Sequence, residues 1–177
     1  MDAIIYTSAG GHTRNYAHMI SLASGLPVYS LGDSEAPEGG DILFLGWIFA
    51  GGVKGYKKAS KKFRVRGLCG VGMSPPGEKV MEDIRKKDRP PADLPLFYLW
   101  GGFELDKLKG INRLIMFLKA KQIAAAMKKI EQPTQEQRQL LIMATTGASQ
   151  VKKESITPIL KWLEQQGVAT LGKERHV

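Results

Sequence analysis

The sequence predicts an α/β fold in which a parallel sheet is covered by helices on both faces. Short apolar runs alternate along the chain with longer segments of helical periodicity. The runs are apolar at consecutive positions, which is typical of strands that are buried on both faces of a parallel sheet. Strands and helices that alternate in this way are joined by right-handed crossovers, so we expect a three-layer α/β/α arrangement.

Five strands are expected, and three of them end in glycine or small-residue loops. The strands are Ala3–Thr7, Pro27–Leu31, Asp41–Gly46, Gly67–Gly72 and Leu96–Trp100. The helices are Thr13–Ser24, Lys54–Lys62, Glu78–Lys87, Gly110–Glu131, Thr134–Ala144 and a last one that starts at Ser155. No repeat or linker divides the chain, so residues 1–177 are expected to form a single domain.

The composition excludes several classes of protein. The chain has 177 residues and a single cysteine, Cys69, which cannot form an internal disulfide. No Cys or His pair has the spacing of a structural zinc site, so no metal is expected. No run approaches the roughly 18 apolar residues of a membrane span, and the first residues lack the pattern of a signal peptide. These features favour a cytoplasmic protein.

Positive charge is concentrated in one segment. The 26 Lys and Arg residues outnumber the 17 Asp and Glu residues, and seven basic residues without an acid fall between positions 54 and 66. Tyr56, Ala59 and Phe63 recur there at helical spacing and form the expected inner face. The lysines that lie in or beside this helix are Lys54, Lys57, Lys58, Lys61 and Lys62. The block predicts an anionic substrate or partner, although a purely solvated helix face is the alternative.

The loop after the first strand is the strongest candidate for a binding site. It consists of Ser8, Ala9, Gly10, Gly11, His12 and Thr13 and leads into a helix. Glycines and hydroxyl residues at a strand-to-helix junction let backbone N–H groups and the helix N-terminus bind a phosphate. The alternative is an ordinary turn in which Thr13 caps the helix. The segment 167–174 approaches a P-loop, but Glu174 replaces the Mg²⁺-binding Ser or Thr, so we reject it.

No catalytic acid, base or nucleophile is assigned. The sequence has no paired carboxylates and no Ser/His/Asp arrangement, and we expect a cofactor to carry the chemistry. His12 is expected to be structural or to face a phosphate, His18 lies inside the first predicted helix, and His176 lies in the tail. Cys69 lies within a predicted strand and is expected to be a small buried residue.

Two further loops are expected at the same edge of the sheet as the phosphate loop. The third strand leads into Trp47, Ile48, Phe49, Ala50, Gly51 and Gly52, and the fourth into Met73, Ser74 and Pro75. One phosphate loop and two loops for a flat ring resemble the layout of the flavodoxins. The segment Ser8–Thr13 is similar to their Ser/Thr-x-Thr-Gly-Asn-Thr motif, with Gly10 and His12 in place of the usual Thr and Asn. The resemblance implies a five-stranded sheet of order 2-1-3-4-5 and bound FMN.

A narrower resemblance covers nearly the whole chain. The segment Tyr98–Leu108 is similar to a Gly-Gly-x-Leu/Phe-Asp/Tyr-x-x-Lys-Leu stretch in the flavodoxin-type, menaquinone-dependent protoporphyrinogen oxidases and their uncharacterised relatives. The segments Thr134–Arg138 and Ile156–Leu160 resemble the two helices that follow it in these proteins. This resemblance implies an FMN-dependent oxidation of a porphyrinogen with a quinone as electron acceptor.

The resemblance also implies a position for each part of FMN. The phosphate is expected in the loop Ser8–Thr13 and the ring between the segments Trp47–Gly52 and Met73–Gly77. Trp47 or Phe49 is expected to stack on the ring, because flat aromatic surfaces attract each other beyond simple burial. The backbone of Ala50, Gly51 and Gly52 is expected near flavin N5, since glycine permits a peptide flip at little cost.

Three functional hypotheses follow from the sequence. The leading one is an FMN-dependent oxidoreductase with an anionic substrate such as a porphyrinogen and a quinone or protein acceptor. The second is a non-enzymatic electron-carrier flavodoxin for an acidic protein partner. The third is a nucleic-acid-binding domain that uses the basic helix, which leaves the loop layout unexplained. The basic, partly apolar segment 110–130 also fits peripheral contact with an anionic membrane surface, with core packing as the alternative.

Overall fold

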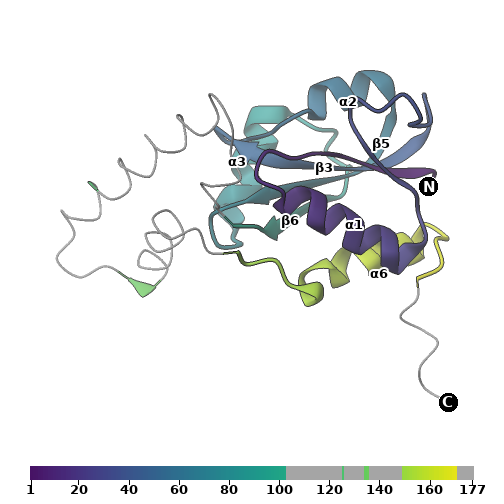
Figure 1. Ribbon diagram of the computed structural model, residues 1–177. Helices are drawn as coiled ribbons and strands as arrows, with labels where there is room; N and C mark the ends of the chain where they lie inside the picture. Colours follow the sequence, from purple (N-terminus) through teal and green to yellow (C-terminus); the bar gives the residue numbers. More distant parts are fainter. Residues whose placement is uncertain (103–124, 126–133, 136–148, 171–177) are drawn as a thin grey trace, which may run out of the picture.

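The central sheet has the predicted parallel arrangement. The computed structural model describes residues 1–102, 125, 134–135 and 149–170 (Figure 1). The five main strands are β1 (Ala3–Thr7), β2 (Val28–Ser30), β3 (Asp41–Phe49), β5 (Arg64–Gly72) and β6 (Leu96–Trp100). They lie in the order β2-β1-β3-β5-β6, and every neighbouring pair is parallel. The expected five-strand order is therefore confirmed.

Helices cover both faces of the sheet. The helices α1 (His12–Ser24) and α6 (Thr157–Gln165) lie on one face, and a short 3₁₀ turn, η2 (Lys153–Ile156), precedes α6. The helices α2 (Tyr56–Lys62) and α3 (Glu78–Asp88) lie on the other face (Figure 1). These four helices start within two residues of the predicted positions, and the three layers are those expected from the alternation of strands and helices.

Two apolar cores fill the space between the layers. Along β3, Phe44 packs towards α2 and α3, whereas Leu43 and Leu45 pack towards α1 and α6. All three side chains are fully buried, as consecutive apolar positions predict for a strand that is covered on both faces. Cys69 is also fully buried, and burial raises the pKa of its thiol well above the ordinary value.

Two strands are longer than predicted: β5 starts at Arg64 instead of Gly67, and β3 continues beyond Gly46. Trp47, Ile48 and Phe49 were expected in a loop, but they extend β3 beyond the end of β1. The chain then turns at Ala50 and Gly51 and returns as the short strand β4 (Gly52–Val53), which pairs antiparallel with β3. Both turn residues have positive φ, 51° and 79°, as a type I′ hairpin turn requires. Aromatic and β-branched residues favour a strand, which explains the extension.

Two described segments meet at the end of β6: the one that ends at residue 102 and the one that begins at residue 149. Gly102 forms an antiparallel bridge with Ser149, and the Gln150 N–H donates to the Gly101 carbonyl at 2.8 Å. The predicted helices Gly110–Glu131 and Thr134–Ala144 lie outside the described residues, apart from positions 125, 134 and 135. Among the helices that are described, none is long and apolar enough to cross a bilayer.

Candidate functional site

The loop between β1 and α1 ends in a left-handed glycine. Gly11 is the N-cap of α1 with φ of 91°, and no side chain caps the helix. The Gly11 N–H donates to Ser8 Oγ at 3.1 Å, which tightens the loop. Thr13 was considered as the N-cap, but it lies inside the first helical turn and is buried. The uncapped first turn directs backbone N–H groups and the positive end of the helix dipole towards the loop.

A hollow of about 690 Å³ opens beside this loop. Its lining combines the loop with the start of α1 and the segment that follows β2. The lining residues are Tyr6, Thr7, Ser8, Ala9, Gly10, Gly11, Arg14, Ser30, Leu31 and Gly32. Four residues of the predicted phosphate loop therefore share one hollow, whereas His12 and Thr13 do not line it. Arg14 and Ser30 were not predicted, although a cation in a first helical turn and a hydroxyl at a strand end are recognisable signals.

His12 does not line the hollow but contacts the segment around Ser149. Its side chain is buried, and Nδ1 lies 3.5 Å from the Ser149 hydroxyl. A Cβ placed on Gly101 would lie 3.5 Å from His12 Cβ, so the start of α1 packs directly on the chain that follows β6. The Tyr16 hydroxyl ties the same region together by donating to the Trp100 carbonyl at 2.7 Å. The position of His12 therefore fits the structural role considered for it.

The β3–β4 hairpin presents an aromatic pair. The rings of Trp47 and Phe49 lie 5.6 Å apart at an angle of 58°, and both side chains are half-buried. Lys54 Nζ lies 4.9 Å from the centroid of the Phe49 ring, within range of a cation–π interaction. The Lys54 N–H donates to the Trp47 carbonyl at 2.9 Å, which extends the hairpin by one bond. The aromatic residues are thus held on a β-hairpin rather than on an irregular loop.

The return strand of this hairpin is anchored to α3. The Val53 N–H donates to Asp88 Oδ2 at 2.6 Å. A Cβ on Gly52 would lie 3.0 Å from Asp88 Oδ1 and from Lys87 Cγ, so a larger residue would press on both side chains. The backbone of Gly52, expected near flavin N5, is therefore in close contact with α3.

Replacing Asp88 with Ala is expected to loosen the hairpin and lower the free energy of unfolding by about 1 kcal/mol. A hydrogen bond to a charged group contributes roughly 1.5–3 kcal/mol. Part of that loss is offset because a carboxylate at a helix C-terminus is unfavourable. Urea denaturation measures the change. The control is Glu82→Ala, which breaks only the exposed pair with Lys86 and should cost less than about 0.5 kcal/mol. Equal losses in the two variants would contradict the anchoring role.

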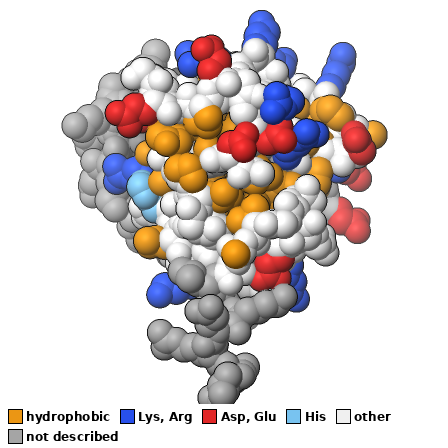
Figure 2. All heavy atoms as spheres, turned by 90° about the vertical axis from the view of Figure 1, so that its right-hand side faces the viewer, with side chains coloured by type: hydrophobic (Ala, Val, Ile, Leu, Met, Phe, Trp, Pro, Cys, Tyr) orange, Lys and Arg blue, Asp and Glu red, His pale blue; other side chains and the backbone are white. Residues whose placement is uncertain are grey.

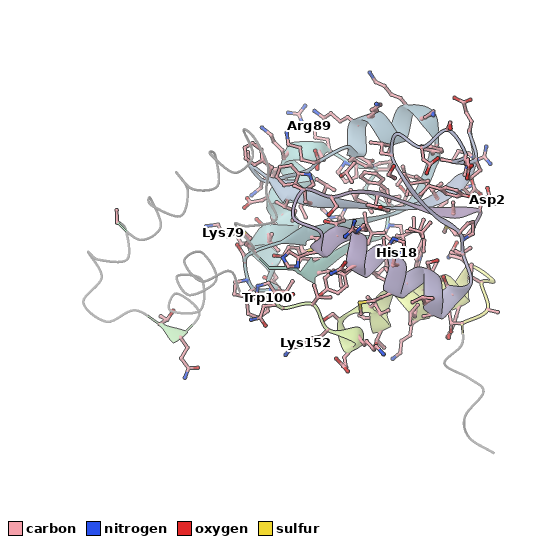
Figure 3. All side chains as sticks on the ribbon, in the orientation of Figure 1. Asp2, His18, Lys79, Arg89, Trp100 and Lys152 are labelled. Carbon is pink, nitrogen blue, oxygen red and sulfur yellow. The ribbon has the colours of Figure 1, made fainter. Side chains whose placement is uncertain are left out.

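The loop after β5 is held by two side chains of β6. Trp100 Nε1 donates to the Met73 carbonyl at 2.9 Å, and the Tyr98 hydroxyl donates to the Ser74 carbonyl at 2.5 Å. Burial raises the pKa of the Tyr98 hydroxyl well above its ordinary value, so this group stays protonated and remains a donor. A Cβ on Gly72 would lie 2.6 Å from the same hydroxyl, so only glycine fits there. Figure 3 places Trp100 at the end of the sheet opposite Asp2.

In the structure, the basic segment 54–66 runs from one end of the sheet to the other. The inner face of α2 is buried as predicted, with Tyr56, Ala59 and Phe63 at most 6% exposed. Lys54 lies beside β1, because the Thr7 hydroxyl donates to its carbonyl at 2.6 Å. At the other end of α2, the Lys62 carbonyl accepts from the Gly39 N–H, two residues before β3 begins.

The lysines of α2 therefore lie near opposite ends of the sheet. Lys57 and Lys58 lie in the first turn, near the carboxyl ends of the strands, whereas Lys61 and Lys62 lie in the last turn. Arg64 and Arg66 belong to β5 and both pair with Asp41, at 2.5 Å and 3.2 Å. These hydrogen bonds hold the pKa of the Asp41 carboxyl below its ordinary value. At the amino end of the sheet, acidic and basic side chains are mixed (Figure 2).

Two different sets of residues at the carboxyl edge of the sheet fit the phosphate and the ring of FMN. The phosphate end is matched by an uncapped helix start, a glycine-rich backbone and a hollow with Arg14 at its wall. The ring end is matched by the half-buried pair of Trp47 and Phe49 and by the tethered Met73–Ser74 loop. Within the described part of the chain, no three His, Cys, Asp or Glu side chains gather into a metal site.

The sheet order and the helices on its two faces define a flavodoxin-like α/β/α fold with a hollow at the carboxyl edge of the sheet. No protein-family model matches the chain, and no curated protein matches it at a significant level.

Proposed function

We propose that the protein is an FMN-dependent oxidoreductase or electron-transfer flavoprotein. One observation carries the proposal: the β1–α1 loop, with an uncapped helix behind it, opens into a hollow at the carboxyl edge of a flavodoxin-like sheet. Ligands of open α/β sheets bind at this edge, close to the point where the strand order reverses. In this sheet the reversal lies at β1, from which this loop departs.

The residues at the edge have distinct roles in this proposal. The backbone of Ser8–Gly11 and the first turn of α1 bind the phosphate, and Arg14 adds a positive charge. Trp47 and Phe49 offer an aromatic surface to the ring, which accepts and donates the electrons when FMN is bound. The tethers from Tyr98 and Trp100 fix the Met73–Ser74 loop on the other side.

The substrate is proposed to be anionic. Lys54, Lys57 and Lys58 lie at or near the carboxyl edge, and no acid occurs between positions 54 and 66. A positive field at this edge attracts carboxylates and favours the reduced, more negative state of a flavin. A porphyrinogen, whose propionates pair with lysines, fits this field, with a quinone or a protein as acceptor. The positive field favours a flavin that oxidises a substrate over a low-potential electron carrier.

Flavin titration tests the proposal. The purified full-length protein is expected to quench FMN fluorescence with a stoichiometry of one per chain, and to show flavin absorption bands after dialysis. Reduction of the bound flavin by a porphyrinogen and its reoxidation by a quinone would support the enzyme. Reoxidation only by an acidic redox protein would support the electron carrier. Absence of FMN binding, together with salt-dependent binding of DNA or RNA, would contradict a flavin function and favour the nucleic-acid hypothesis.

A further inference from the structure

We infer that the hollow beside the β1–α1 loop holds the adenosine-phosphate half of a flavin dinucleotide, so that FAD binds more tightly than FMN. The inference rests on the proposed flavin function and specifies the form of the cofactor. It is argued from the position of the hollow, from its volume and from the chemistry of its lining.

The hollow extends away from the expected ring site. Its lining includes Ser30, Leu31 and Gly32, which follow β2, and no residue of the Trp47–Gly52 or Met73–Gly77 segments. Since β1 lies between β2 and β3, the hollow and the β3–β4 hairpin are on opposite sides of β1. FMN ends at its phosphate, so FMN with its ring at the hairpin leaves the space beside Ser30–Gly32 unfilled.

The volume suits a larger group than a phosphate. The hollow measures about 690 Å³. This value falls within the roughly 300–1,000 Å³ of sites that take ligands of drug size. A second phosphate with a nucleoside attached is of the appropriate size, and FAD carries this group directly beyond the phosphate that it shares with FMN.

The lining suits a pyrophosphate and a nucleoside. Ser8 and Ser30 supply hydroxyls, Arg14 supplies a guanidinium, and no carboxylate is among the lining residues. Arginine binds phosphate oxygens through two parallel N–H groups, which a lone lysine does not reproduce. The partly exposed ring of Tyr6 offers an aromatic contact for a base, whereas Leu31 is buried in the core. A Cβ on Gly32 would meet no atom within 4 Å, so the wall is open there.

The connectivity of this part of the sheet supports the same ligand. The segments β1, α1 and β2 form a parallel unit in which Tyr6 pairs with Ser30. In units of this kind a pyrophosphate binds at the helix N-terminus, and the adenosine ribose lies towards the end of the second strand. Asp33 lies beyond Ser30, and its carboxylate accepts the Glu35 N–H at 3.0 Å within the next turn, outside the lining.

Calorimetric titration of the flavin-free, full-length protein with FMN, FAD and ADP tests the inference. FAD is expected to bind at least tenfold more tightly than FMN, and ADP is expected to displace FAD. Ser30→Asp places a carboxylate in the hollow and should weaken FAD binding at least tenfold more than it weakens FMN binding, because two phosphates and the nucleoside of FAD lie closer to it than the single phosphate of FMN. The matched control is Ser60→Asp on the exposed face of α2, which should leave both affinities within twofold.

The outcomes separate the inference from the proposed function. FMN binding that equals or exceeds FAD binding would overturn the dinucleotide and leave the flavin function intact. Equal weakening of FMN and FAD by Ser30→Asp would also overturn it, because the hollow would then belong to the part of the site that both flavins share. Binding of neither flavin would overturn both the inference and the proposed function.

Discussion

Replacing Gly11 with Asp is expected to abolish FMN binding, with at least a hundredfold loss of affinity. Gly11 is the N-cap of α1, and a Cβ there would meet no atom within 4 Å, so the new side chain is not excluded by a clash. It instead places a carboxylate where the phosphate is proposed to bind, and like charges at short range repel strongly. The φ of 91° adds strain, since a left-handed conformation costs other residues roughly 1–2 kcal/mol.

The matched control for this variant is Gly25→Asp at the other end of the same helix. Gly25 also has a positive φ, 70°, and open space around its Cβ position. It should lose at least as much stability by thermal denaturation, because a carboxylate is unfavourable at a helix C-terminus, but it should retain FMN affinity by fluorescence titration. Unchanged FMN affinity in Gly11→Asp, or equal loss in both variants, would overturn the phosphate-loop assignment.

Reversing the charge of Lys57 and Lys58 to Glu is expected to lower the midpoint potential of bound FMN by tens of millivolts. These lysines lie in the first turn of α2, near the proposed flavin site, and their positive charge favours the reduced flavin. Reduction by an anionic donor should also slow. Both effects should shrink as salt rises, because the Debye length falls from about 30 Å at 0.01 M to about 3 Å at 1 M. Potentiometric titration at two salt concentrations measures the change.

The fold supplies a control with the same change in charge. Lys61 and Lys62 lie in the last turn of α2, on the side of the sheet where β3 begins. Reversing this pair should shift the potential less, and reversing all four should give roughly the sum of the two shifts. FMN content and thermal stability should change little for the first pair, whose side chains are exposed. A wild-type potential in the fourfold variant would reduce the basic helix to a solvated face and leave the anionic substrate supported only by the family resemblance.

The inner strands β1, β3 and β5 were predictable because they are buried on both faces over runs of consecutive apolar residues, whereas the edge strands β2 and β6 are only partly buried. The third strand was predicted to end too early, at Gly46. This glycine and the two at positions 51 and 52 suggested a loop over the whole segment between them. The hairpin depends on an Ala-Gly turn, which lacks the Asn-Gly or Asp-Gly signal typical of type I′ turns. Its anchor, Asp88, lies 35 residues beyond Val53 in the chain, a contact that local sequence patterns cannot reveal.

The position of the candidate site was predictable, but its shape was not. A glycine-rich loop between a buried strand and a helix is a local pattern, and the structure places four of its residues in one hollow. The direction of that hollow depends on Ser30–Gly32, whose sequence carries no signal beyond the end of a short strand. The division of the lysines depends on the direction of α2 across the sheet, and this direction follows from the tertiary contacts of Lys54 and Lys62.

The bridge between Gly102 and Ser149 makes the core of this fold tolerant of changes in chain length at one point. Residues bridged in this way have Cα atoms only about 4.5–5.5 Å apart. The 46 intervening positions therefore begin and end at the same place, and their number does not affect the register of any strand. Doubling the length of a loop costs only about 0.6 kcal/mol in closure entropy. The bridge therefore holds the end of β6 and the segment that starts at Ser149 together next to His12 and the β1–α1 loop, whatever the length of chain between them.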